Sequence, residues 1–251
     1  MSVASLPPET PDIETSSDDY ARRFSGAAGA YFLKVQEQAI KRALTGCHGS
    51  TVLEVGGGHG QLVPIFLRQG RELTILGSDD STHRRVRECY PEADIQYETG
   101  NILELPYRDR SFDIVVAVRL ISHIDQWQTL LREFCRVARH SIIIDYPRWI
   151  SLNAFTPLFF KMKKSLEGNT RSYTSFFRSD LEKAFQQHDF NVVSSWNQFF
   201  VPMLVHRSLK GAQWLQTAEC AFRWTGLTRL LGSPGVLRAE RMPHPDKQAE
   251  R

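Results

Sequence analysis

Hydrophobic positions in residues 18–146 follow two alternating patterns. Short, continuous runs rich in β-branched residues are followed by stretches in which apolar residues recur every three or four positions. The first pattern predicts strands buried on both faces, and the second predicts helices that bury one face. We expect strands at 51–55, 73–77, 95–98, 113–118 and 141–145, and helices at 61–68, 81–90 (capped by Ser81) and 127–138.

An earlier helical pattern starts near Ser17 or Asp18, and we expect Gly26 and Gly29 to interrupt it near its middle. Residues 1–17 are rich in Ser, Pro, Thr and acids and predict a disordered leader. The helical spacing is carried by Tyr20, Phe24, Tyr31, Val35 and Ala39.

The alternation breaks after Tyr146. The later patterns predict a helix at 178–188, strands at 190–196 and 235–241, and an amphipathic stretch at 207–231. Repeated strand–helix units predict an α/β protein with a doubly wound, mostly parallel sheet. We divide the chain into the leader 1–17, an N-terminal helix and core at 18–146, a cap with the last strands at 147–242, and a polar tail at 243–251.

Composition narrows the class of protein. Of 251 residues, 41% are hydrophobic and 24% charged, which excludes a wholly disordered chain, a collagen and a disulfide-stapled miniprotein. The four cysteines form no C-x-x-C pair, so we expect neither a metal site nor disulfides. The net charge of +3 does not indicate a nucleic-acid partner. No secretory signal or long apolar run is visible, so we expect a cytoplasmic protein without stable membrane insertion.

A glycine-rich segment follows the first strand: V-L-E-V-G-G-G-H-G-Q-L at 52–62. Glycines at alternate positions let a ligand approach the backbone at the carboxyl end of a strand. The G-x-G-x-x-G register of dinucleotide sites fails, because Gln61 or Val63 takes the place of the third glycine. Glu54 would repel a pyrophosphate and would suit a ligand that bears an ammonium group and a sulfonium. The glycines are Gly56, Gly58 and Gly60.

The pattern Glu54-x-Gly56-x-Gly58-x-Gly60 resembles motif I of the class I S-adenosylmethionine-dependent methyltransferases. The resemblance implies that Asp79, with Asp80 beside it, holds the ribose of this cofactor. Taken by itself, Asp79 is better read as part of a helix-capping box next to Ser81. The resemblance also places Asn101 on the adenine amino group, where the family usually has Asp, and Ile102 on the adenine ring.

Two later segments support the resemblance. L-P-Y-R-D-R-S-F-D at 105–113 is similar to the family's segment before the fourth strand, and we interpret Phe112 and Asp113 there as structural. Residues 136–145 resemble the segment around the fifth strand, without its Pro-Gly-Gly turn. The match runs from 51 to 145 and is similar to methyltransferase type 11, the subgroup that includes quinone-biosynthesis enzymes. It implies a seven-stranded, Rossmann-like methyltransferase sheet with a helical, aromatic cap.

Two residues after the fourth strand are candidates for chemistry. His123 is either the general base or a packing residue in its loop. Arg119 can bind a substrate carboxylate or phosphate, or can hold Glu54 or Asp145. The cofactor-binding residues that we expect are Glu54, Gly56, Gly58, Gly60, Asp79, Asp80, Asn101, Ile102 and Arg119.

The aromatic residues have two interpretations. Those of the N-terminal helix either cover the cofactor or pack on the sheet, and those of 147–231 line an acceptor pocket or build the core of the cap. We expect methyl transfer to a small molecule that is apolar, ring-bearing or linked to lipid or sugar, with oxygen favoured by prevalence in the subgroup. The alternatives are a catalytically silent partner subunit, methylation of RNA or protein, and the disfavoured dinucleotide oxidoreductase. We expect a monomer or a homodimer. The later aromatics are Trp149, Phe155, Phe159, Phe160, Tyr173, Phe176, Phe177, Phe199 and Phe200.

Overall fold

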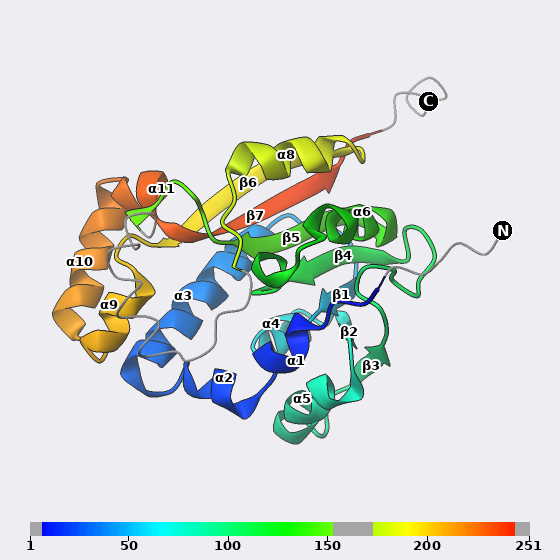
Figure 1. Cartoon of the computed structure of the whole chain (residues 1–251), viewed down its shortest axis with the longest axis horizontal. Coiled ribbons are helices and arrows are strands. Elements are labelled where there is room, and N and C mark those ends of the chain that lie inside the picture. Colours follow the sequence, from blue (N-terminus) through cyan, green and yellow to red (C-terminus); the bar gives the residue numbers. More distant parts are fainter. Residues whose placement is uncertain (1–6, 153–172, 244–251) are drawn as a thin grey trace.

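The computed structural model describes residues 7–152 and 173–243, which form one seven-stranded sheet in the order β3-β2-β1-β4-β5-β7-β6 (Figure 1). Strands β1 to β5 are parallel, and β7 runs antiparallel between β5 and β6. The mostly parallel, seven-stranded sheet expected from the sequence is therefore confirmed. The strands are β1 (Thr51–Val55), β2 (Glu72–Gly77), β3 (Ile95–Thr99), β4 (Phe112–Ala117), β5 (Ala138–Tyr146), β6 (Phe190–Phe199) and β7 (Ser233–Arg241).

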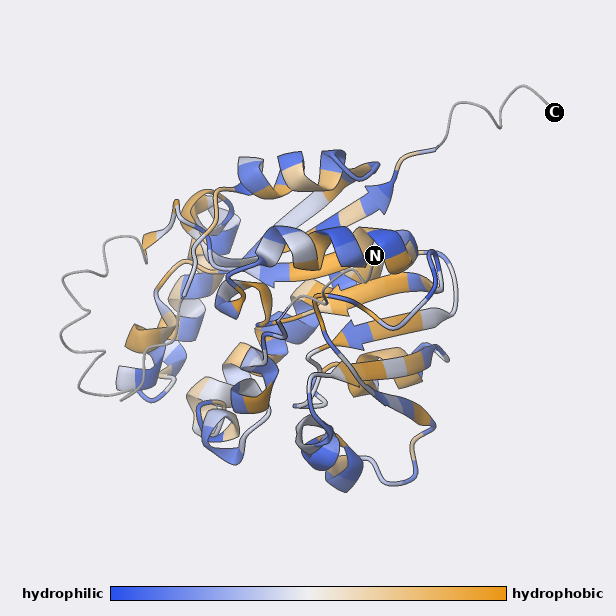
Figure 2. Cartoon of the chain, turned by 45° about the vertical axis from the view of Figure 1, so that its right-hand side comes forward, coloured by the Kyte–Doolittle hydropathy of each residue, from blue (hydrophilic) through white to orange (hydrophobic). Residues whose placement is uncertain are grey.

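Helices cover both faces of the sheet, so successive strand residues enter two different cores. Leu53 and Val115 pack with α6 (Trp127–Val137) and α8 (Arg178–Gln186) on one face. Their neighbours Val52 and Ile114 pack with α3, α4 and α5 on the other. Figure 2 shows the result as hydrophobic strands enclosed by helices whose outer sides are hydrophilic. The second set of helices is α3 (Gly26–Leu44), α4 (Val63–Arg68) and α5 (Arg84–Cys89).

The amphipathic stretch at 207–231 is part of three short helices, α9 (Met203–Ser208), α10 (Gln213–Trp224) and α11 (Leu227–Leu231). They lie beside α3 and β6 (Figure 1) and form the expected helical cap. Glu219 of α10 is wholly buried, and its carboxylate accepts hydrogen bonds from the backbone N–H groups of Phe200 and Val201 and contacts His206 Nε2. A buried polar group thus joins the cap to the end of β6.

The cap aromatics divide between core and surface. Phe176 packs against Trp127 in the core, and Phe199 packs against Phe32 of α3. Tyr173 and Phe177 are exposed. Core packing therefore explains Phe176 and Phe199. None of the described cap aromatics lines the cavity that is described in the next section. Phe155, Phe159 and Phe160 lie outside the described residues.

The N-terminal segment differs from the expected disordered leader. Residues 11–15 form α1 (Pro11–Thr15), and the Asp12 side chain is wholly buried because it finds hydrogen-bond donors in Ser78. A second short helix, α2 (Asp18–Arg22), begins at its Ser17 cap. The expected interruption falls at 23–25, just before α3, and Gly29 lies inside α3 rather than at a break.

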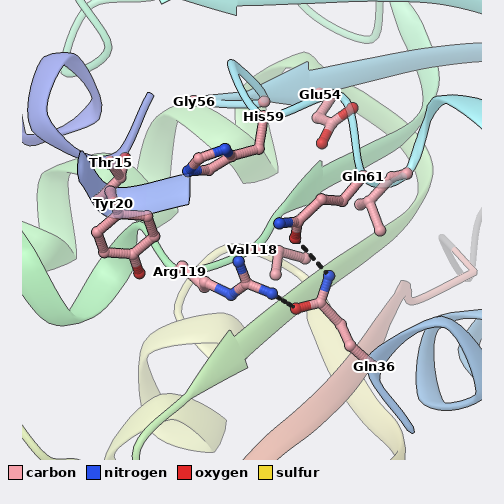
Figure 3. A pocket seen from close by; sticks show the side chains of 11 residues that line it. Thr15, Tyr20, Gln36, Glu54, Gly56, His59, Gln61, Val118 and Arg119 are labelled. Carbon is pink, nitrogen blue, oxygen red and sulfur yellow. Dashed lines mark hydrogen bonds between the residues drawn. The ribbon is translucent and has the colours of Figure 1, made fainter. Parts of the chain in front are cut away.

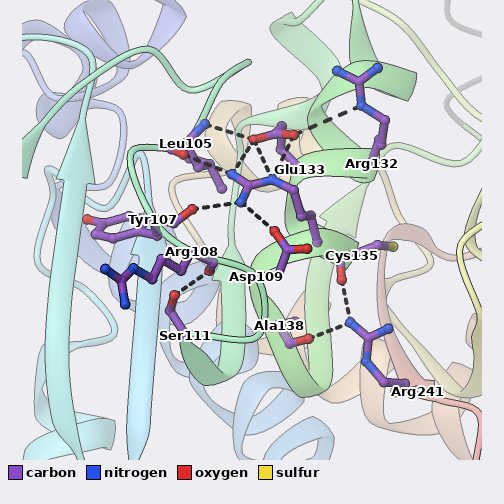
Figure 4. Close-up of polar contacts among 11 residues, drawn as sticks. Leu105, Tyr107, Arg108, Asp109, Ser111, Arg132, Glu133, Cys135, Ala138 and Arg241 are labelled. Atoms are coloured by element: carbon purple, nitrogen blue, oxygen red, sulfur yellow. Dashed lines mark hydrogen bonds and ion pairs between the residues drawn. The ribbon is translucent and has the colours of Figure 1, made fainter.

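The loop that leads into β4 is fixed by a buried carboxylate that the sequence did not single out. Glu133 of α6 accepts from the backbone N–H of Leu105 (3.0 Å), and Arg136 donates to the carbonyls of Leu105 and Tyr107 and pairs with Asp109 (Figure 4). The strand that carries the candidate site is therefore anchored by α6.

Asp113 stands at the start of β4 and has the structural role expected from the sequence. Its carboxylate accepts from the backbone N–H groups of Ser50 (2.9 Å) and Thr51 (3.1 Å), at the start of β1. It also contacts Arg139. Asp113 thereby sets the register of the two central strands.

Candidate cofactor site

A small cavity lies at the carboxyl ends of β1 and β4, where a doubly wound sheet binds ligands (Figure 3). Its walls come from the glycine loop, the end of β4, α3 and the N-terminal segment. The polar side chains that face it include Gln36, Glu54, His59, Gln61 and Arg119.

Glu54 is the most informative residue of the cavity. Its side chain is almost wholly buried, and its Oε2 atom has no hydrogen-bond partner among the described residues. Burial raises the pKa of this carboxyl to about 8. A Cβ at Gly57 would lie 2.4 Å from the Glu54 carboxyl carbon, so the glycine makes room for the side chain. An unpaired, buried carboxyl is the feature that a cationic ligand would complete.

Arg119 directs its guanidinium into the same cavity. It donates to Gln36 Oε1, and Gln36 in turn donates to Gln61 (Figure 3). The guanidinium carbon lies 3.8 Å from the ring centre of Phe24, a cation–π contact. Burial lowers the pKa of Arg119.

The backbone of Arg119 settles which acid it contacts. Its φ of +61° is in the left-handed region, which is unfavourable for residues other than glycine. In this conformation its N–H donates to the Asp145 carboxylate at 2.5 Å. Burial raises the pKa of Asp145 to about 6. Arg119 thus contacts Asp145 through its backbone N–H, whereas its guanidinium donates to Gln36. Among the described residues, the guanidinium makes no hydrogen bond to Asp145 or Glu54, the two acids named from the sequence.

The predicted glycines are required for different structural reasons. Gly56 and Gly60 adopt φ values of +73° and +65°, which glycine accepts without strain. A Cβ at Gly58 would lie 1.9 Å from the Ser16 Oγ atom and 2.4 Å from the Thr82 carbonyl oxygen. Gly58 is thus required by the close approach of the N-terminal segment.

Asp79 and Asp80 stand at the end of β2, away from the cavity lining. Asp79 is exposed, and its carboxylate accepts from the Ser81 N–H at 2.9 Å. It caps the short 3₁₀ turn η1 (Asp80–His83) before α5, so the expectation that Ser81 is the cap is wrong. Asp80 is exposed and pairs with Arg87. Ribose binding by either acid stays a prediction.

The predicted adenine contacts also have local roles. The Asn101 side-chain oxygen accepts from the Leu103 N–H at 3.0 Å and fixes the turn after β3. Ile102 is wholly buried in one of the two apolar cores. Neither residue lines the cavity, and their roles toward a cofactor stay predictions.

His123 lies in the short 3₁₀ turn η2 (Ile121–His123), and its ring centroid is 5.7 Å from that of Tyr173. It does not line the cavity.

His59, by contrast, lines the cavity, and the centroid of its ring lies 5.3 Å from that of Tyr20, on which it stacks. Burial lowers the pKa of His59 to about 4. Of the N-terminal aromatics, Tyr20 and Phe24 reach the site, whereas Tyr31 packs against Phe199.

Sequence reasoning missed several polar residues of this region, among them Gln36 and Asp12. Gln36 is buried on the apolar side of α3, between Phe32 and Ile40 in the helical repeat. A polar residue inside an apolar stripe was a usable signal. Asp12 had no such signal, because a carboxylate in an acidic, proline-containing segment is typical of solvated chain.

The described residues hold no group of three or more His, Cys, Asp or Glu side chains placed to bind a metal ion. Among those residues, no helix is both long and apolar enough to cross a membrane.

Comparison with known proteins relates this chain to methyltransferases. Residues 53–143 match the family model described as a methyltransferase domain. A protein of Mycolicibacterium smegmatis named "Probable S-adenosylmethionine-dependent methyltransferase" is 34% identical over 109 residues, which cover 43% of this chain and 42% of that protein. An O-methyltransferase of Aspergillus sclerotiorum is 30% identical over 101 residues, which cover 38% of each chain. This chain therefore spans less than half the length of these relatives.

The similarity in fold to solved methyltransferases covers most of the chain. The magnesium protoporphyrin IX methyltransferase of Synechocystis, solved with bound S-adenosylhomocysteine, superposes with a TM-score of 0.60 at 12% identity and covers 89% of this chain and 93% of that one. At this identity the likeness shows the fold alone. Residues 53–143 therefore resemble a methyltransferase domain, and the sheet has the fold of solved S-adenosylmethionine-dependent methyltransferases.

Proposed function

We propose that this protein binds S-adenosylmethionine in the cavity beside the glycine loop and transfers its methyl group to a small-molecule acceptor. The observation that carries the proposal is the buried Glu54 carboxyl, in a cavity that also receives the Arg119 guanidinium. Its Oε2 has no hydrogen-bond partner in the part of the chain that the structure describes. An opposed acid and base at one end of a cleft suit the ammonium and carboxylate groups of an amino acid.

The residues present fit the cofactor. Glu54 would accept from its ammonium group and Arg119 would donate to its carboxylate. Asp79 would accept from the ribose hydroxyls, with Asn101 on the adenine amino group and Ile102 beside the ring. When bound, the cofactor supplies an electrophilic methyl group on a sulfonium, and the task of this chain is to orient the acceptor and exclude water.

For the acceptor we favour a small molecule methylated on oxygen, with an apolar, ring-bearing or lipid- or sugar-linked structure. The likeness to a fungal O-methyltransferase supports the choice of oxygen. His123 follows β4 and would remove the acceptor proton as methyl transfer proceeds. A silent partner subunit or a macromolecular acceptor would show cofactor binding without turnover of small molecules.

The proposal is tested by calorimetric titration with S-adenosylhomocysteine, with NADH as the comparison ligand. We expect micromolar binding of the former alone. The Glu54→Gln variant should bind at least tenfold more weakly, because it loses a charge-assisted hydrogen bond. Glu92→Gln, an equivalent change at an exposed site, is the matched control. Unchanged affinity in Glu54→Gln would remove its proposed role, and binding of NADH alone would refute the assignment.

A further inference from the structure

Helix α1 lies against the glycine loop and the residue that follows β2. The Asp12 side chain is wholly buried there. Its Oδ2 accepts from the Ser78 N–H at 2.7 Å, and its Oδ1 accepts from the Ser78 hydroxyl at 2.5 Å. Ser78 directly precedes Asp79, the acid proposed to hold the ribose. A carboxylate from the N-terminal segment therefore takes up the donors at the edge of the proposed ribose site.

The same helix region lies against the glycines that a ligand would approach. A Cβ at Gly58 would meet the Ser16 Oγ at 1.9 Å, and one at Gly56 would lie 3.6 Å from the Asp12 Cβ. Ser16 and Asp12 thus fill the space that these glycines leave open in front of the loop.

The cavity reaches α1 and does not extend past it. Its lining includes Thr15, Glu54 and Arg119, but not Asp79 or Asn101. It therefore contains the end proposed for the amino-acid part of the cofactor and stops short of the end proposed for the nucleoside. A ligand that spans from Glu54 to Asp79 has to pass the position of Asp12 and Ser16.

The segment is also held on both sides of α1. The Glu9 carboxylate accepts from the backbone N–H groups of Asp125 (2.8 Å) and Gln126 (3.0 Å), just before α6. Asp18 pairs with Arg84 through exposed side chains. Exposed ion pairs contribute little free energy, so the Asp18–Arg84 pair positions α1 without locking it.

We propose that α1 is an internal competitor of the cofactor, in which Asp12 closes the nucleoside end of the site and is displaced when the cofactor binds. The inference rests on the cofactor site proposed above. Its physical consequence is a reduced apparent affinity, because only the fraction of molecules with α1 displaced can bind. A partner or condition that holds α1 elsewhere would raise the affinity without touching a cofactor contact.

The test is calorimetric titration of full-length protein with S-adenosylhomocysteine. Asp12→Asn keeps the size of the side chain but turns an NH₂ group toward the donors of Ser78, so we expect affinity to increase roughly tenfold. Asp19→Asn removes a carboxylate from an exposed position in the same segment and should leave affinity unchanged. Thermal unfolding of both variants verifies that the fold is intact.

Hydrogen exchange gives a second readout on the unmodified protein. The Ser16 and Ser17 amides donate within α1 to Asp12 and Glu14. Addition of S-adenosylhomocysteine should accelerate their exchange, since binding displaces the helix. Slower exchange, or equal or weaker binding by Asp12→Asn, would overturn the proposal and make α1 a cover over the bound cofactor. Absence of binding by both wild type and Asp12→Asn would instead refute the cofactor site itself.

Discussion

At the scale of single residues, the site depends on charged groups held away from water. Within residues 7–152 and 173–243, one Glu54 oxygen has no hydrogen-bond partner, and Arg119 adopts a left-handed backbone conformation. Both features raise the free energy of the folded protein and are typical of functional sites. The glycine motif predicted Glu54, and the position after the fourth strand suggested Arg119, but the geometry shows which of their atoms remain available to a ligand.

His123 provides a prediction at this scale. If it removes the acceptor proton, His123→Ala should lower the rate of methyl transfer by about 10²- to 10⁴-fold, with little change in binding of S-adenosylhomocysteine. Labelled-methyl transfer to the acceptor and calorimetry measure the two effects. His188→Ala, in the turn after α8, is the control, and equal turnover in both variants would assign His123 to packing.

At the scale of elements, the cap is attached to the sheet by a polar cluster rather than by apolar contact alone. Glu219 satisfies two backbone N–H groups at the end of β6, and His206 packs between Tyr31 and Phe32 of α3. Helices α9 to α11 therefore owe their position to one buried carboxylate and its partners.

Replacement of Glu219 tests this attachment. Glu219→Ala leaves two backbone N–H groups without their acceptor, and we expect a loss of about 2–4 kcal/mol in the free energy of unfolding. Glu182→Ala breaks an exposed pair with Arg178 on α8 and should cost less than about 1 kcal/mol. Urea denaturation compares the variants, and equal losses would show that Glu219 is dispensable to the cap.

At the scale of the whole molecule, buried titratable groups make stability depend on pH. The pKa values of Glu54 and Asp145 are raised to about 8 and about 6 by burial, whereas that of His59 is lowered to about 4. At pH values between their unfolded and folded pKa values, the two carboxyls are ionised in the unfolded chain but still protonated in the folded protein. The free energy of unfolding therefore declines as pH rises through this range. The neutral His59 makes the folded state lose stability as pH falls below about 6.5.

The pH dependence can be measured without ligand. Between pH 5 and pH 8 we expect the free energy of unfolding of the wild type to fall by a few kcal/mol, mainly through Glu54. Glu54→Gln should reduce this slope, and the variant should be more stable than the wild type at pH 8. Denaturation at several pH values provides the test, with Glu92→Gln as the control. Parallel pH profiles would contradict the assignment to Glu54.

The sequence by itself determined the sheet and the loop. Continuous β-branched runs separated by helical repeats require strands buried on both faces, and the spacing of Glu54 and the glycines is local information within one strand and turn. The structural role of Asp113 was predicted from its place at the start of a strand, although its contact with Ser50 joins residues 63 positions apart. The exact cap of η1 was not, because Asp79 and Ser81 are both capping residues.

Only the tertiary structure decided how the site is closed. The contact of Asp12 with Ser78 joins residues 66 positions apart, and the bond from Arg119 to Gln36 joins residues 83 positions apart. Neither separation corresponds to a helical or strand repeat, so no periodicity in the chain encodes it. A carboxylate in a polar leader becomes buried only when folding brings two donors within reach, and that requires β2 and α1 to be packed together.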